Sequence, residues 1–180
     1  IQIPPTLSAE ERMIVRFEQA CQEETPVFLP GEDICFVRTV THLPDIFTKM
    51  EWDNIKKTHY VHELGYPSNL SPDYERVIRQ GLLAQYETAD EGGRRFIDAL
   101  LGLAGRYRDA AEQAGRPDIA AVLARVPAYG ATSFREALQS FRILHFALWL
   151  EGNYHVTCGR FDQYMYPFYK HDIDTLSLIH

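Results

Sequence analysis

The sequence predicts a mainly α fold with short strands. Two capping boxes mark helix starts, and long stretches place apolar residues at helical spacing. Only one run is rich in β-branched and aromatic residues, which are typical of strands. The chain has 180 residues, of which 46% are hydrophobic and 24% charged. This length and composition suit one globular domain with its own core, and no linker separates a second.

The first half begins with Ser8-Ala-Glu-Glu11, a capping box that predicts a helix running to about Glu24. The run Ile34–Val40 predicts a short strand because β-branched and aromatic residues dominate it. From Thr41 to Ser71 the periodicity is poor and prolines and glycines interrupt it, so we expect loops with short helical turns.

The residues Ser71-Pro72-Asp73 predict the start of the next helix, with an N-cap followed by a proline at the first helical position. A longer helix is predicted from about Asp90 to Ala114, and a short one from Pro117 through Val126. Ser133-Phe-Arg-Glu136 is a second capping box and starts a helix that runs to Glu151. Its residues Ile143–Leu150 are apolar nearly all round, so we expect this half to be buried on every face, within something larger.

Charge and hydropathy argue against several classes of function. The net charge of −7 and pI near 5.5 do not favour a nucleic-acid partner. No apolar run reaches the roughly 20 residues that span a bilayer, and the first residues do not resemble a secretory signal. The three cysteines are far apart and form no CxxC pair, which favours reduced thiols. We therefore expect a cytoplasmic protein that binds neither nucleic acid nor membrane.

The densest group of polar and aromatic residues is the segment 152–164, which directly follows the apolar helix. Its two glycines suit a sharply turning backbone, and such a loop commonly presents functional groups. It contains His155, Arg160 and Asp162. The alternative is that these three side chains only satisfy buried backbone groups.

Two further groups of residues are weaker candidates. His59 and His62 are three residues apart and could share a helical face toward a metal, but no third ligand is visible, so no metal site is predicted. Cys35 and Cys158 are candidate nucleophiles, the latter because His155 and Arg160 are near in sequence. The alternative for both is a buried, inert thiol.

Several strings of residues resemble one known family. They are Thr132–Phe141, Leu150-Glu-Gly-Asn, and Gly159-Arg-Phe-Asp-Gln-Tyr-Met-Tyr-Pro-Phe-Tyr169, with upstream matches at Val37-Arg-Thr, Pro72-Asp-Tyr-Glu-Arg-Val-Ile and Arg125-Val-Pro-Ala. Together they resemble the pyruvate formate-lyase-like domain of glycyl radical enzymes, over nearly the whole chain and in the expected order. The Gly-Arg-Phe-Asp-Gln-Tyr string is similar to the dehydratase, carbon–nitrogen lyase and decarboxylase members rather than to pyruvate formate-lyase itself.

The resemblance implies that this segment is part of a ten-stranded α/β barrel in the intact parent, with an enclosed active site. In that family a glycyl radical, installed by a radical S-adenosylmethionine activase, generates a cysteine thiyl radical that abstracts hydrogen from a small substrate. It implies cleavage of a C–O, C–N or C–C bond, the activase as partner, and allows a homodimer of the parent.

The chain departs from the family pattern in ways that bear on activity. It contains neither the Arg-Val-x-Gly radical motif nor the Gly-Cys-x-Glu loop, so we expect residues 1–180 to be a partial domain, an amino-terminal fragment with no catalytic residue and no bound cofactor. The substrate-contact positions of the family fall on Asn69, Tyr154 and His155, which we expect on the same side of the fold. The alternatives are a formate C-acetyltransferase-type enzyme, or an inert paralogue that acts as a helical binding or scaffold module.

Overall fold

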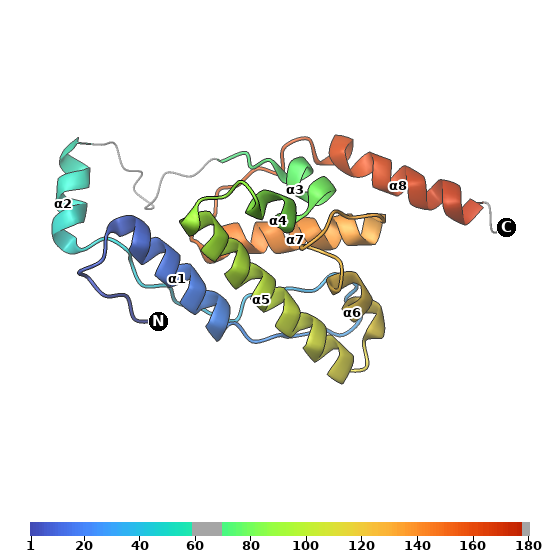
Figure 1. The fold of residues 1–180 in the computed structure, drawn as a ribbon, viewed down its shortest axis with the longest axis horizontal. Coiled ribbons are helices and arrows are strands. Elements are labelled where there is room, and N and C mark those ends of the chain that lie inside the picture. The colour runs from blue at the N-terminus through green and yellow to red at the C-terminus, as the bar shows by residue number, and fades with distance from the viewer. Residues whose placement is uncertain (59–69, 178–180) are drawn as a thin grey trace.

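The computed structural model describes residues 1–58 and 70–177, which are organised almost entirely as helices (Figure 1). In chain order these are α1 (Ala9–Glu23), α2 (Lys49–Thr58), α3 (Tyr74–Gln80), α4 (Leu82–Tyr86), α5 (Glu91–Gln113), α6 (Pro117–Leu123), α7 (Phe134–Leu150) and α8 (Phe161–Ser177). Helices α1 and α5 lie side by side, α6 packs against α5, and α7 passes behind the beginning of α5 (Figure 1). None of the helices in this described part is long and apolar enough to cross a membrane.

Two hydrophobic cores hold the helices together. The larger one joins α1, α5, α6 and α7 around fully buried residues such as Tyr107 and Leu103. The smaller one packs α3 and α8 against the other side of α7, through Tyr74, Ile78 and Met165. Helix α7 therefore contributes to both cores and connects the two halves of the fold.

The predicted helix starts at Ser8, Asp90 and Ser133 are confirmed by their capping hydrogen bonds. The Ser8 hydroxyl accepts from the backbone N–H of Glu11 at 3.1 Å, and the Ser133 hydroxyl accepts from that of Glu136 at 3.2 Å. The Asp90 carboxylate accepts from the Gly93 N–H at 2.7 Å. At the start of α3, however, the N-cap is Asp73 rather than Ser71, so Pro72 lies before the helix.

The prediction of short strands is wrong for the described residues, which contain no β-sheet, so this segment shows no part of a barrel. Its clearest case, Ile34–Val40, is an unpaired segment in which Phe36 has a positive φ of 88°. Side chains replace a strand ladder there. The Cys35 N–H donates to the Gln139 amide oxygen at 2.9 Å, and the Val37 N–H donates to the Tyr107 hydroxyl at 3.3 Å. The β-rich composition therefore reflects burial between helices, because Phe36 stacks on Tyr107 at 4.1 Å.

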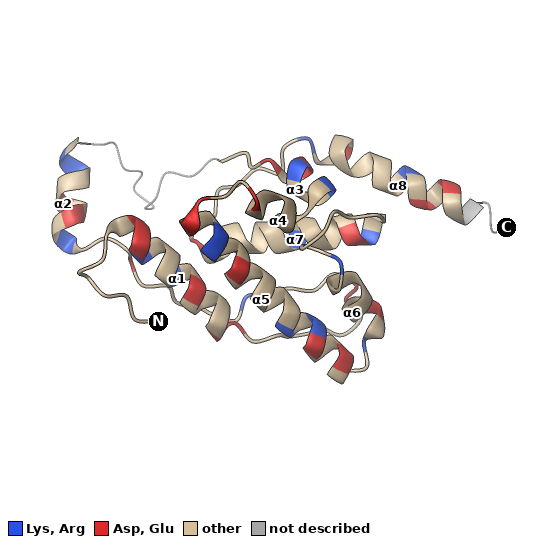
Figure 2. Cartoon of the chain, in the orientation of Figure 1, with Lys and Arg blue, Asp and Glu red and all other residues tan. Residues whose placement is uncertain are grey.

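The second half of α7 is less buried than the sequence predicts. Ile143, Phe146 and Leu150 are buried, but Trp149 is 42% exposed and Leu144 and Leu148 are only partly covered. Charged residues mark α1, α5, α6 and the first half of α7, whereas the second half of α7 carries none (Figure 2). The described residues therefore leave part of this half uncovered, and its burial on every face within something larger stays a prediction.

Helix α2 lies in the region where only loops with short helical turns were expected. Thr48 caps it, because its hydroxyl accepts from the Glu51 N–H at 3.3 Å and its own N–H donates to the Glu51 carboxylate at 2.7 Å. Arg12 of α1 donates to both Glu51 carboxylate oxygens at 2.7 Å and lowers the pKa of Glu51 to about 2. Capping and this ion pair fix α2 beside α1.

Candidate functional site

The loop between α7 and α8 turns sharply, as its two glycines predict. Gly152 and Gly159 have φ values of 85° and 60°, a left-handed conformation that glycine adopts at little cost. The loop is shorter than the segment 152–164 considered above, since α8 already begins at Phe161. Its helical continuation packs Tyr164 and Met165 into the smaller core, and the Tyr164 hydroxyl donates to the Cys158 carbonyl at 2.7 Å.

A short parallel bridge joins this loop to the segment that precedes α3. The Leu70 N–H donates to the His155 carbonyl at 3.3 Å, and the Thr157 N–H donates to the Leu70 carbonyl at 3.0 Å. Two chain segments far apart in sequence are thus held together by backbone hydrogen bonds. Asn69 itself lies outside the described residues, so its expected proximity to Tyr154 and His155 stays a prediction.

Tyr154 is positioned by groups that the sequence did not single out. Its hydroxyl accepts from an Arg38 guanidinium N–H at 3.1 Å, and its ring meets that of Trp149 edge-on at 6.2 Å between centroids. The same guanidinium donates to the carbonyls of Val40 and Trp149, at 2.8 Å and 3.3 Å. Arg38 therefore ties the loop to the extended segment 34–40, while Tyr154 as a residue remains 52% exposed.

His155, Arg160 and Asp162 are all exposed. The alternative that they merely satisfy buried backbone groups therefore does not describe this loop. Loops held on a scaffold in this way commonly carry functional groups.

A second titratable pair lies beside the loop, on α3 and α7. The Tyr74 hydroxyl and the His145 Nδ1 are 2.9 Å apart, within hydrogen-bond distance. His145 stacks on Phe141 at 5.7 Å and contacts Trp149, one helical turn away on either side. Burial, and secondarily the charge of Arg142, lowers the pKa of His145, which favours a neutral imidazole. A histidine inside the apolar run of α7 was the sequence signal for this pair.

The cysteines differ in their surroundings. Cys35 is buried, its Sγ lies 3.4 Å from the Gln139 amide oxygen, and burial raises its pKa to about 12. A thiol of this kind is a poor nucleophile at neutral pH, so the structure does not support Cys35 as a candidate. Cys158 is exposed in the loop.

Metal ligands are not gathered in the part of the chain that the structure describes, where no group of three histidine, cysteine or acidic side chains meets. His59 and His62, the pair considered above, lie outside the described residues. The Arg-Val-x-Gly and Gly-Cys-x-Glu motifs are absent from the sequence, so no residue present fits the role of a radical glycine or thiyl cysteine.

Comparison with known protein families and solved structures assigns the chain to one class of protein. A family model described as pyruvate formate lyase-like matches residues 32–178, most of the chain. The chain belongs to the pyruvate formate lyase-like family.

Solved structures of glycyl radical enzymes have a similar fold. The protein studied for 1,2-propanediol dehydration in Roseburia inulinivorans matches 96% of this chain at 21% identity with a TM-score of 0.74. The B12-independent glycerol dehydratase from Clostridium butyricum matches 92% at 19% identity, TM-score 0.68. A glycyl radical enzyme from Archaeoglobus fulgidus matches 94% at 17% identity, TM-score 0.71. The chain spans 31%, 32% and 33% of these proteins, respectively.

Proposed function

We propose that this chain is part of a glycyl radical enzyme that, when intact, cleaves a C–O, C–N or C–C bond of a small substrate after hydrogen abstraction by a thiyl radical. The family membership supports the class, and two of the similar structures are named for dehydration of small diols and triols. The observation that carries the proposal is the Leu70–Val156 bridge. It joins the two regions in which the family resemblance places substrate contacts.

The roles of this chain are binding and orientation. Tyr154 is held by Arg38 and offers its ring and hydroxyl, while His155 offers an imidazole from the same fixed loop. Together with Asn69 they would contact the substrate. Radical formation would depend on residues outside this sequence and on an S-adenosylmethionine-dependent activase, and a homodimer of the parent is part of the same proposal. The cytoplasm is its proposed location.

The test uses an enzyme that includes this chain together with the radical glycine and the cysteine loop. After anaerobic activation, we expect turnover of a small diol, amine or acid, and His155→Ala should lower it by at least ~10-fold, the usual contribution of an acid–base or orienting group. His171→Ala is the matched control, because His171 is exposed on α8, away from the loop. Equal turnover of the His155→Ala and His171→Ala enzymes would remove His155 from the site.

A further inference from the structure

The side chain of Arg38 lies beside the loop between α7 and α8 and is bonded there to neutral groups. Its Nε and Nη1 atoms donate to the carbonyls of Val40 and Trp149, respectively, and Nη1 also donates to the Tyr154 hydroxyl. Among the described residues, no acidic side chain pairs with this guanidinium, and its Nη2 atom makes no hydrogen bond and is not buried. The charge of Arg38 is therefore held in place without being neutralised.

The contact with Arg38 makes the Tyr154 hydroxyl available as a donor. A tyrosine hydroxyl has one hydrogen to donate and accepts through its lone pairs. Because an Arg38 N–H is donated to the oxygen, the hydroxyl hydrogen is left for another acceptor, and the described part of the chain supplies none. Tyr154 is exposed, so a ligand can reach this hydrogen. Arg38 Nη2 and the Tyr154 hydroxyl thus offer neighbouring donors, one of them charged.

A second arginine–tyrosine pair of the same fold provides a contrast. Arg94 lies over the ring of Tyr86, with its Cζ 5.5 Å from the ring centroid. The corresponding distance from Arg38 to the Tyr154 ring is 5.8 Å. The Tyr86 hydroxyl, however, donates to the Asp98 carboxylate at 3.3 Å, so a carboxylate of the chain itself already accepts its hydrogen. At Tyr154 the described residues provide no such carboxylate, which favours one supplied by a ligand.

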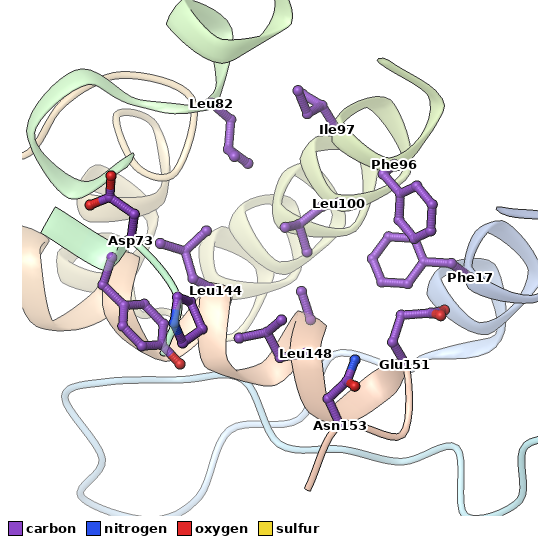
Figure 3. Close-up of a pocket in the computed structure, with 13 residues that line it drawn as sticks. Phe17, Asp73, Leu82, Phe96, Ile97, Leu100, Leu144, Leu148, Glu151 and Asn153 are labelled. Carbon is purple, nitrogen blue, oxygen red and sulfur yellow. The ribbon is translucent and has the colours of Figure 1, made fainter. Parts of the chain in front are cut away.

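The apolar pocket between α1, α5 and α7 is a separate feature (Figure 3). It has a volume of about 280 Å³ and chiefly aliphatic and aromatic walls, and its lining includes Asn153 but neither Arg38 nor Tyr154. Walls of this kind do not select the charge of a ligand. An anionic group is therefore assigned to Arg38 and Tyr154 rather than to this pocket.

We propose that Arg38 and Tyr154 bind a carboxylate group of the substrate, an inference that rests on the proposed function and names the substrate class of its site. The two oxygens of a carboxylate can accept from Arg38 Nη2 and from the Tyr154 hydroxyl. The ring of Trp149, which is partly exposed and meets the Tyr154 ring edge-on, offers apolar surface to the body of the ligand. Because carbonyl groups already hold the guanidinium, little ordering of Arg38 is needed on binding.

The test compares benzoate, benzamide and benzylamine, which are similar in size and differ in charge, on the full 180-residue chain. Binding is followed by the NMR signals of the Trp149 indole N–H and the Tyr154 amide. We expect benzoate to shift both signals, with an affinity at least ~10-fold higher than that of either other probe. Absence of shifts at millimolar benzoate, or equal affinities for the three probes, would overturn the proposal. Binding needs no radical, so this result would leave the proposed bond cleavage untouched.

Variants locate the binding. Arg38→Gln should lower the affinity for benzoate by at least ~10-fold, whereas Arg94→Gln, at the contrasting arginine–tyrosine pair, should leave it unchanged. Since Arg38→Gln also removes hydrogen bonds to two carbonyls, Tyr154→Phe is the second variant, because it keeps the ring and deletes only the hydroxyl. It should lower the affinity for benzoate by at least ~3-fold. A benzoate affinity that Tyr154→Phe leaves unchanged, or that Arg94→Gln lowers as much as Arg38→Gln does, would refute the site.

Discussion

The packing around Tyr74 and His145 changes the protonation of the histidine. The imidazole is held between Phe141 and Trp149 on α7, and its Nδ1 faces the Tyr74 hydroxyl. Burial disfavours its charged form, so the pKa of His145 in the folded chain lies below its ordinary value of 6.5. The pair is thus sensitive to acid at pH values near neutrality.

Acidification should destabilise the chain through His145. The unfolded chain keeps the ordinary pKa and takes up the proton first, so stability falls as pH drops through 6.5 and stops falling below the folded-state pKa. In His145→Gln this part of the pH dependence should be missing. Urea unfolding between about pH 7 and pH 5 measures it.

The control for this prediction is His171→Gln, because His171 is exposed on α8. If His145→Gln and the unchanged chain lose equal stability over that pH range, His145 does not titrate as the structure indicates.

The candidate site was only partly predictable from single residues. The glycines of the loop, Gly152 and Gly159, are recognisable in the sequence, and both adopt the left-handed conformation. Arg38 was not recognisable as a partner of Tyr154, because the two are 116 residues apart and no local pattern links them. Long-range hydrogen bonds of this kind become visible only when the fold brings the segments together.

At the scale of elements, the residues after α1 depend on one buried carboxylate. Glu24 is 2% exposed, and its carboxylate accepts from the backbone N–H groups of Thr39 and Val40 at 2.7 Å and 3.2 Å. It also accepts from the Thr39 hydroxyl. These bonds fix the end of the extended segment 34–40 against α1.

Glu24→Ala should therefore destabilise the chain by about 3 kcal/mol, because it leaves two buried N–H groups unsatisfied. The neighbouring Glu23→Ala is a matched control: the Glu23 side chain is half exposed and pairs with the amine of Ile1, so about 0–1 kcal/mol is expected. Denaturant unfolding measures both. Similar losses for the two variants would contradict the role given to Glu24.

Local sequence signals predicted helices better than the extended segment. Caps at Ser8, Asp90 and Ser133 gave the correct starts of α1, α5 and α7, because a cap acts over three residues. The same signal, Thr48-Lys-Met-Glu51, was present for α2 and was missed. Helix α8, which contains Pro167, was also missed. For Ile34–Val40 the amino-acid composition wrongly predicted a strand. The backbone N–H groups of this segment bond to side chains of distant helices instead of to a neighbouring strand.

At the scale of the whole molecule, the chain corresponds to about a third of the enzymes it is similar to. Its sequence lacks the Arg-Val-x-Gly and Gly-Cys-x-Glu motifs. Incubated anaerobically with an activase and S-adenosylmethionine, residues 1–180 alone should give no glycyl radical doublet in electron paramagnetic resonance. An enzyme that carries both motifs is the positive control. A doublet from this polypeptide would refute the assignment of the radical to another part of the enzyme.

The side-chain hydrogen bonds of the segment 34–40 also determine how the molecule opens. A strand at the edge of a sheet can detach while the rest of a protein stays folded, but here the amide hydrogens are held by Gln139, Tyr107 and Glu24, which belong to α7, α5 and the end of α1. The amide hydrogens of Cys35, Val37 and Thr39 should therefore exchange with deuterium no faster than the helical core opens. Although its backbone forms a loop, the segment 34–40 should be protected from hydrogen exchange as well as the helical core is.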